Sequence, residues 1–320
     1  MIGSFEEQRL VGLSNKLFQL IILPTRNCQL RCTYCYEEHE NIKIKKSIID
    51  NIIEFIIKRS TNTEKFQISW FGGEPLLSKK TIVYFLKILK EKNINYTSGI
   101  TTNLVNFNEN IFNEFISLKL SHYQVTLDGD KDYHDKKRIF INNKGSFDKI
   151  MKNLIMMKNS NHDFYVLIRL HYHGDNFNNL ENLIEILKDY FIDDHRFGIY
   201  IKKIAGQNIN LMKESSLIKN EIDLLSNKLI YYKINPKNNL HEGICYASKA
   251  NSLIIDVDGK IRKCTYGIDD PINEIGYIDN DGKLIINQEM YKEWISYLVN
   301  NDLEGSLCPY VKLKKKYNNQ

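Results

Sequence analysis

The stretch Cys28-Gln-Leu-Arg-Cys32-Thr-Tyr-Cys35 places three cysteines within eight residues, directly after the apolar segment 17–23. Three thiolates on one tight loop can hold three corners of a cubane iron–sulfur cluster, which leaves the fourth iron open to a small molecule. Zinc sites usually take four N or S ligands in paired short spacings, and no second pair completes such a set here. The spacing therefore predicts a [4Fe–4S] cluster bound by Cys28, Cys32 and Cys35.

Strand-like and helix-like segments alternate outward from this loop, over residues 17–235. Six short segments rich in Ile, Val, Phe or Tyr are predicted strands: 17–23, 66–71, 96–102, 122–127, 164–172 and 196–204. Apolar residues at three- and four-residue spacing predict the helices between them, at 48–57, 76–89, 112–116, 150–157 and 180–187. This alternation predicts an α/β fold with a parallel sheet and right-handed crossovers, and six strands fit a partial barrel as well as an open sheet.

The pattern changes in the last part of the chain. A helix is predicted at 217–232, and the turn-rich break 235–239 follows it. Beyond the break, Asp258-Gly259 and Asp281-Gly282 predict hairpin turns, and a last helix is predicted over 288–299. We therefore expect three parts, with a boundary near 236–243: an N-terminal extension 1–16, a core 17–235 and a small domain 236–320.

The composition excludes several classes of protein. The chain has 320 residues, 42% hydrophobic and 26% charged, which is ordinary for a globular protein and argues against disorder. No apolar run reaches about 18 residues, and the N-terminus lacks a secretory signal, so we expect a cytoplasmic protein without a membrane partner. The net charge of +5 is modest, and the basic run 312–316 is expected to be a solvated tail, so no nucleic-acid partner is predicted. In a reducing compartment, cysteines favour metal binding over disulfides.

The cysteine spacing, with Tyr34 just before the last cysteine, resembles the signature of the radical S-adenosylmethionine (SAM) superfamily. The resemblance implies a partial (β/α)6 barrel core, in which SAM chelates the open iron of the cluster through its amine and carboxylate. It also implies a reductant such as flavodoxin or ferredoxin. One electron then cleaves SAM to methionine and a 5′-deoxyadenosyl radical, which abstracts a hydrogen atom from the substrate.

The segment Trp70-Phe-Gly-Gly-Glu-Pro75 resembles the glycine-glycine-glutamate-proline loop of the same superfamily. By that resemblance, Gly72, Gly73 and Glu74 bind the methionyl amine of SAM. Glycine allows close backbone approach, and a carboxylate suits an ammonium group. The alternative is an ordinary turn before a helix, since Pro75 suits a first helical turn.

Two further motifs extend the resemblance. Asn103 closes the third predicted strand and is a candidate cofactor-binding residue. Residues 126–129 and 134–138 resemble the Ser/Thr-x-Asp-Gly and His-Asp-x-x-Arg pattern of peptide- and protein-modifying members, with Thr in place of the more usual Ser. The resemblance implies that Thr126 bonds the SAM ribose or carboxylate and that Arg138 pairs with the carboxylate.

Two polar residues near these motifs can each be interpreted in two ways. His134 is either a capping or structural residue or has a direct role. Arg169 lies on an otherwise apolar predicted strand, where it either faces the barrel lumen or forms a structural pair.

The spacing Cys245-x13-Gly259-x4-Cys264 resembles the opening of the SPASM/twitch extension, which carries one or two auxiliary iron–sulfur clusters. A full SPASM domain continues with five more cysteines, whereas only Cys308 remains here. Three thiolates can hold one cluster whose fourth ligand is missing, is not a cysteine or comes from the substrate. We predict a trimmed, twitch-like module with one auxiliary [4Fe–4S] cluster on Cys245, Cys264 and Cys308. The alternative is a degenerate module with buried or free thiols.

The resemblance is closest to SPASM-associated maturases and implies an enzyme that modifies a ribosomally synthesised peptide by crosslink, thioether or epimerisation. Only about sixteen residues precede the first predicted strand, so we expect a separate leader-binding protein or direct recognition of the core peptide. The sequence does not identify the catalytic residues.

Three other functions stay open. Anaerobic sulfatase maturases use an Asp beside a cluster cysteine, where this chain has Thr265. A radical enzyme acting on a small molecule is the second. A non-enzymatic iron–sulfur protein is the third, and it would need no SAM-binding set such as Glu74, Thr126 and Arg138.

Overall fold

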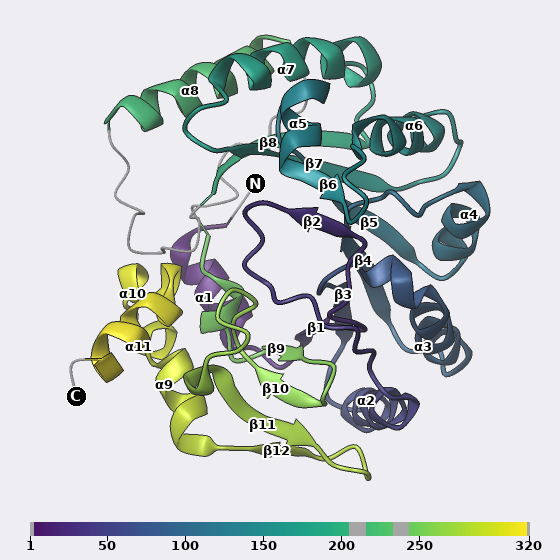
Figure 1. Ribbon diagram of the computed structural model, residues 1–320. Coiled ribbons are helices and arrows are strands. Elements are labelled where there is room, and N and C mark those ends of the chain that lie inside the picture. Colours follow the sequence, from purple (N-terminus) through teal and green to yellow (C-terminus); the bar gives the residue numbers. More distant parts are fainter. Residues whose placement is uncertain (1–2, 205–215, 233–242, 319–320) are drawn as a thin grey trace. The chain divides into compact units, whose positions relative to one another are not determined.

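The computed structural model describes residues 3–204, 216–232 and 243–318 (Figure 1). The chain forms two compact units. The first unit contains Met1–Asn27, Glu40–Ser98 and Asn239–Gln320, and the second contains Cys28–His39 and Gly99–Asn238. Among the described residues, every helix is too short or too polar to cross a membrane.

The first unit contains a mixed sheet in which β1 has a parallel neighbour on each side, β3 and β9. Beyond β9 the strands continue antiparallel as β10, β11 and β12. The strand bounds are β1 (Leu17–Ile22), β3 (Lys65–Trp70), β9 (Ser252–Ile255), β10 (Lys260–Arg262), β11 (Glu274–Ile278) and β12 (Leu284–Ile286). Strand β4 (Tyr96–Thr102) crosses the boundary between the units. The C-terminal strands therefore extend the sheet that β1 begins.

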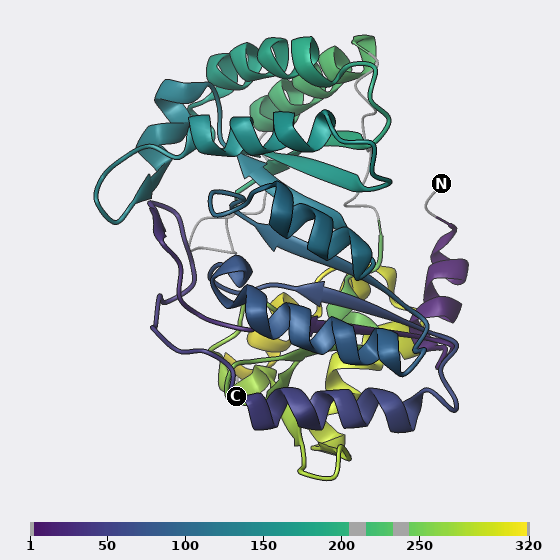
Figure 2. The same ribbon diagram turned by 90° about the vertical axis from the view of Figure 1, so that its right-hand side faces the viewer.

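Amphipathic helices cover this sheet. Helix α2 (Lys46–Arg59) buries the stripe predicted from its isoleucines, including Ile49, Ile52 and Ile56. Figure 2 shows α2 and α3 (Lys79–Glu91) side by side in front of the strands. The other helices of the unit are α1 (Phe5–Leu13), α9 (Gln288–Val299), α10 (Leu303–Leu307), α11 (Pro309–Asn318) and the 3-10 turns η1 (Pro75–Ser78), η3 (Tyr246–Ser248) and η4 (Pro271–Asn273).

The second unit is built on parallel strands β5, β7 and β8, with helices packed against them. Their bounds are β5 (Leu120–Leu127), β7 (Tyr165–Tyr172), β8 (Phe197–Lys203), α4 (Glu109–Ser117), α6 (Phe147–Lys158), α7 (Phe177–Phe191) and α8 (Ser216–Tyr231). A separate antiparallel pair joins β2 (Leu30–Cys32) to β6 (Arg138–Phe140), and α5 (Lys131–Lys137) precedes β6.

The structure confirms the predicted α/β class and its parallel strands. Strands β2 and β6 were not predicted, because three residues are too few to show a period. The basic run 312–316 lies in α11 rather than in a solvated tail, and its Lys316 pairs with Glu293. The predicted break at 235–239 lies outside the described residues, and so does the boundary at 236–243 except for its last residue.

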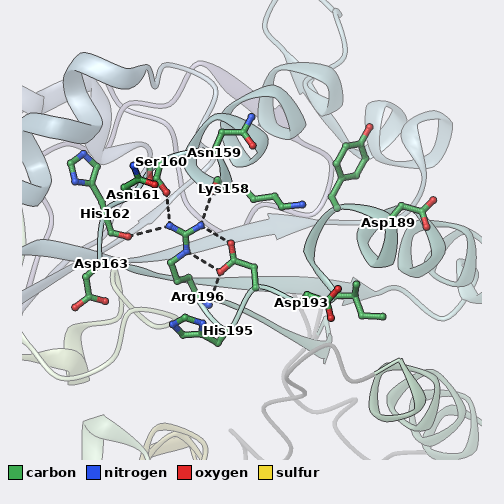
Figure 3. A pocket seen from close by; sticks show the side chains of 13 residues that line it. Lys158, Asn159, Ser160, Asn161, His162, Asp163, Asp189, Asp193, His195 and Arg196 are labelled. Carbon is green, nitrogen blue, oxygen red and sulfur yellow. Dashed lines mark hydrogen bonds and ion pairs between the residues drawn. The ribbon is translucent and has the colours of Figure 1, made fainter.

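A pocket lies at the amino ends of β7 and β8, lined by residues 158–163, 189–190 and 192–196 (Figure 3). All five N–H bonds of the Arg196 guanidinium have acceptors there. They donate to the carbonyl oxygens of Lys158, Ser160 and His162 and to both carboxylate oxygens of Asp194, at 2.6 to 3.2 Å. Arg196 thereby satisfies carbonyls at the end of α6, and the pocket has a structural explanation.

We expect Arg196→Ala to lower the free energy of unfolding by about 2 to 4 kcal/mol, because three carbonyls and a carboxylate lose their donor. Urea-induced unfolding followed by circular dichroism measures the change. The matched control is His195→Ala, an exposed neighbour in the same loop, which should stay within about 0.5 kcal/mol of the parent. Equal stabilities of the two variants would contradict this role.

Candidate functional site

The cysteine loop belongs to the second unit, where β2 fixes its middle. Cys32 lies opposite Arg138 in the β2–β6 pair, and the Cys35 N–H donates to the Cys32 carbonyl at 3.0 Å. The backbone N–H of Leu30 points at Cys28 Sγ at 3.4 Å. Burial raises the pKa of Cys32 and raises that of Cys35 to about 11. These thiols would be neutral at pH 7 without a metal ion, which would deprotonate them on binding.

The glycine loop follows β3 in the first unit and lies tightly against the backbone that leads into Cys28. Gly72 has a φ of 111°, and a Cβ on Gly73 would lie 2.5 Å from the carbonyl oxygens of both Arg26 and Asn27. The Glu74 N–H donates to the Asn27 carbonyl at 2.8 Å. Only glycine fits such an approach, so the Gly-Gly pair is required by packing.

Glu74 is completely buried after this loop. Its Oε1 accepts the N–H of Leu76 at 2.9 Å and so caps the 3-10 turn η1, in which Pro75 is the first residue. The turn before a helix that the alternative interpretation predicted is therefore present, with Pro75 in its first position. The Glu74 carboxylate lies buried beside the glycine loop.

Tyr34 connects the cysteine loop to the motif after β5. Its hydroxyl donates to Asp128 Oδ2 at 2.8 Å and accepts from Arg138 Nη1 at 2.7 Å. Burial by itself raises the pKa of Asp128, but the neighbouring His171 and His173 side chains and the charge of Arg138 hold that pKa well below its usual range. Asp128 therefore stays ionised in the interior of the unit.

Arg138 is buried, and within the described residues its Nε has no hydrogen-bond partner. Burial by itself lowers the pKa of Arg138, but Cys32, Tyr34 and Asp128 raise it well above its ordinary value. An ionised guanidinium with an unused buried donor is suited to an anion.

Asn103, Thr126 and Arg169 also form hydrogen bonds in this unit. Asn103 Oδ1 accepts from Gln29 Nε2 at 3.1 Å, and the Asn103 amide nitrogen lies 3.7 Å from Cys28 Sγ. Thr126 Oγ1 accepts two hydrogen bonds from Arg169, at 3.0 and 3.2 Å. Arg169 is thus paired with a hydroxyl, and the Thr126 O–H is left as a donor.

His134 has a structural role in this geometry. Its Nδ1 accepts the backbone N–H of Asp128 at 3.4 Å, and its Nε2 lies 3.0 Å from Ser146 Oγ, which donates to the Arg138 carbonyl. Burial lowers the pKa of His134 to about 4, so it is neutral. It positions the backbone of both Asp128 and Arg138, and the structural interpretation holds.

The tail cysteines lie together in the first unit. The Cys245 N–H donates to the Ser306 carbonyl at 3.0 Å, and the Cys264 N–H donates to Asn273 Oδ1 at 2.8 Å. Burial, together with the nearby thiols of Cys245 and Cys308, raises the pKa of Cys264 to about 12. The structure therefore brings three residues that are distant in sequence into electrostatic range of one another.

Sequence analysis did not identify His171 and His173, which lie at the carboxyl end of β7 against Asp128. Burial lowers the pKa of His171 to about 3, so its imidazole is neutral. The available signal was the His-Tyr-His run where a predicted strand ends, because active sites of parallel α/β folds form at the carboxyl ends of strands. The Arg196 pocket lies at the opposite ends.

Known proteins resemble this chain in sequence and in fold. The chain is 28% identical, over 93% of its length and 87% of the relative, to a cysteine-type anaerobic sulfatase-maturating enzyme of Clostridium novyi. The structure resembles anSMEcpe with bound AdoMet and Cp18Cys peptide (TM-score 0.68, 14% identity, 88% of this chain and 83% of that chain). It also resembles Streptococcus suis SuiB bound to its precursor peptide SuiA (TM-score 0.60, 15% identity, 94% and 69%). Residues 22–187, just over half of the sequence, match the family model of the radical SAM superfamily, and the chain therefore belongs to that superfamily.

Proposed function

We propose that this radical SAM enzyme modifies a ribosomally synthesised peptide by forming a crosslink or thioether or by epimerising a residue. When bound, the cluster supplies an electron to SAM, and the resulting 5′-deoxyadenosyl radical abstracts a hydrogen atom from the substrate. One observation carries the proposal: three cysteines within eight residues follow β1, and the glycine loop packs against the backbone leading into them. This is the donor set that a cluster with one open iron requires.

In this proposal, different residues of the chain bind different groups of SAM. Glu74 holds the methionyl ammonium beside the glycine loop. Arg138 holds the carboxylate, since its buried Nε has no partner among the described residues. Thr126 donates its O–H to the ribose or the carboxylate. Tyr34 keeps Arg138 oriented through the 2.7 Å hydrogen bond, and Asn103 lies beside the Cys28 thiol.

A peptide substrate is supported by the relatives. The anSMEcpe and SuiB structures each contain a bound peptide by their titles, and the relative in Clostridium novyi is a protein-maturing enzyme by name. We further propose the division into an extension 1–16, a core 17–235 and a tail module 236–320, with an electron donor such as flavodoxin or ferredoxin. A separate leader-binding protein would present the peptide.

We also propose one auxiliary [4Fe–4S] cluster on Cys245, Cys264 and Cys308. Lys263 supports it, because its buried Nζ, which donates to the carbonyls of Lys249 and Ser252, lies within electrostatic range of Cys245. Burial lowers the pKa of Lys263 to about 7, and the negative charge of a thiolate-bound cluster would favour the charged amine. A group of the peptide substrate would supply the fourth ligand.

Sulfatase maturation is the second candidate, because the chain and the Clostridium novyi relative are similar over nearly their full lengths. Against it, Thr265 follows Cys264, and its hydroxyl hydrogen-bonds the Tyr246 hydroxyl at 2.8 Å, so no carboxylate base stands there. Incubation with a cysteine-containing sulfatase peptide decides the point by mass spectrometry, since formylglycine would form only if this candidate is right.

Replacing Cys28, Cys32 and Cys35 together by Ala should abolish SAM cleavage, because no thiolate remains to hold the open cluster. Production of 5′-deoxyadenosine by the anaerobically reduced protein is the measurement, and circular dichroism checks that the variant folds. Normal 5′-deoxyadenosine production by this variant would falsify the assignment of the cluster.

Glu74→Gln and Arg138→Ala should each weaken SAM binding by about 2 to 5 kcal/mol, or at least roughly thirtyfold, because each removes a buried charge that pairs with SAM. Gln keeps the oxygen that caps η1. Equilibrium dialysis of reconstituted protein measures the dissociation constant, and Glu40→Gln, an exposed residue, is the control. An unchanged constant in both variants contradicts the proposed roles.

Reconstituted protein should hold about eight irons per chain, four on each cluster. The variant with Ala at Cys245, Cys264 and Cys308 should hold about four, because only the first site remains. Iron analysis with EPR spectroscopy on both proteins tests this. If both hold about four, the tail binds no cluster.

A further inference from the structure

Three ligand-type side chains of the second unit meet in a group that the proposed binding of SAM does not use directly. They are Asp128, which follows β5, and His171 and His173 at the end of β7. One ligand atom of each lies within 4.8 Å of the others. Asp128 has no exposed side-chain surface, and the side chains of the two histidines are only 8–9% exposed.

The distances in this group suit a single metal ion. Both imidazoles face the same carboxylate oxygen: Asp128 Oδ1 lies 3.2 Å from His171 Nδ1 and 3.7 Å from His173 Nε2. An ion bonded at about 2.1 Å to N and O ligands with tetrahedral angles separates those ligands by about 3.4 Å. The two distances from Asp128 Oδ1 bracket that value.

An independent observation points to a missing ligand. His173 Nε2 is buried and has no hydrogen-bond partner within the described residues, and its 3.7 Å distance from Asp128 Oδ1 exceeds a hydrogen bond. Buried polar atoms are nearly always satisfied, and an orphaned one calls for an ion or water. A metal ion between this nitrogen and Asp128 would satisfy it.

The surrounding residues hold all three side chains in place. The completely buried amide of Asn176 donates to the backbone carbonyls of Asp128 and His171, at 2.7 and 2.9 Å. It accepts from the His173 N–H at 2.8 Å. The Tyr34 hydroxyl lies 2.8 Å from Asp128 Oδ2, 3.0 Å from Asp128 Oδ1 and 3.2 Å from His171 Nδ1. Such hydrogen bonds behind the ligands fix the geometry of metal sites.

We propose that Asp128, His171 and His173 bind one divalent transition-metal ion, Zn²⁺ or Fe²⁺. Two imidazoles and a carboxylate suit these ions, whereas Mg²⁺ and Ca²⁺ favour sets made only of oxygen ligands. Three protein ligands leave a coordination position open, as in catalytic rather than structural sites. The ion would polarise a carbonyl or carboxylate oxygen of a bound molecule. The proposal does not depend on the peptide substrate proposed above.

Co²⁺ is the probe, because its visible absorption reports its ligands. Anaerobically reconstituted protein, treated with a chelator too weak to strip the clusters, is titrated with Co²⁺ and then with competing Zn²⁺. We expect one Co²⁺ per chain, with the bands of N/O ligation and without the thiolate charge-transfer band that binding to unfilled cysteine sites would give. Zn²⁺ should displace it.

The variants are His173→Gln, Asp128→Asn and, as a control, the exposed His195→Gln. The first two should weaken Co²⁺ binding at least tenfold, and the control should bind as the parent does. His173→Gln decides alone if Asp128→Asn does not fold, because His173 Nε2 makes no hydrogen bond among the described residues. No Co²⁺ binding by the parent, binding with thiolate bands only, or equal affinity of His173→Gln would each overturn the proposal.

Production of 5′-deoxyadenosine in the same samples separates this proposal from the radical SAM assignment. Failure to bind Co²⁺ with SAM cleavage intact counts against the metal site alone.

Discussion

A completely buried carboxylate, Asp256, is the constraint on which the first unit depends. It follows β9 and accepts hydrogen bonds from Arg26, which follows β1, and from Arg262 Nε at the end of β10, the latter at 3.0 Å. Burial by itself lowers the pKa of Arg26, but hydrogen bonds to Asp256 and Asp269 raise it well above its ordinary value. Removing one partner would leave a buried charge unpaired, so these segments have to stay together.

The two arginines that pair with this carboxylate each lie close to a cysteine in the sequence. Arg26 precedes Cys28 by two residues, and Arg262 precedes Cys264 by two. The carbonyl of Arg26 is also one of the two oxygens that Gly73 approaches. One ion-pair network therefore holds two segments in place. One is the backbone before Cys28, against which the glycine loop packs, and the other is the β9–β10 hairpin that precedes Cys264. The backbone hydrogen bonds between the parallel strands β9 and β1 also hold these segments together.

Asp128 is the counterpart in the second unit, since it also follows a parallel strand and is also completely buried. The two acids differ in their partners. Two guanidinium groups pair with Asp256, so its carboxylate stays ionised and its role is structural. Asp128 accepts a hydrogen bond from the Tyr34 hydroxyl and lies 3.2 Å from the neutral imidazole of His171, and Arg138 donates to the same hydroxyl. The weaker pairing leaves Asp128 and its neighbours able to accept a ligand, because less of their bonding capacity is used.

The sequence by itself determined the α/β class, the six predicted strands, both hairpin turns and the cysteine loop. Periodicity, turn residues and ligand spacing are local properties of the sequence, so they can be recognised without knowledge of the fold. Only the tertiary structure decided which side chains meet: Arg26 with Asp256 across 230 positions, Arg169 with Thr126, and two histidines with Asp128. It also decided that the tail strands join β1 and that His134 supports a backbone. Strand order, register and burial determine which of these side chains meet. The residues are far apart in the sequence and show no periodic spacing, so the sequence alone does not reveal the pairs.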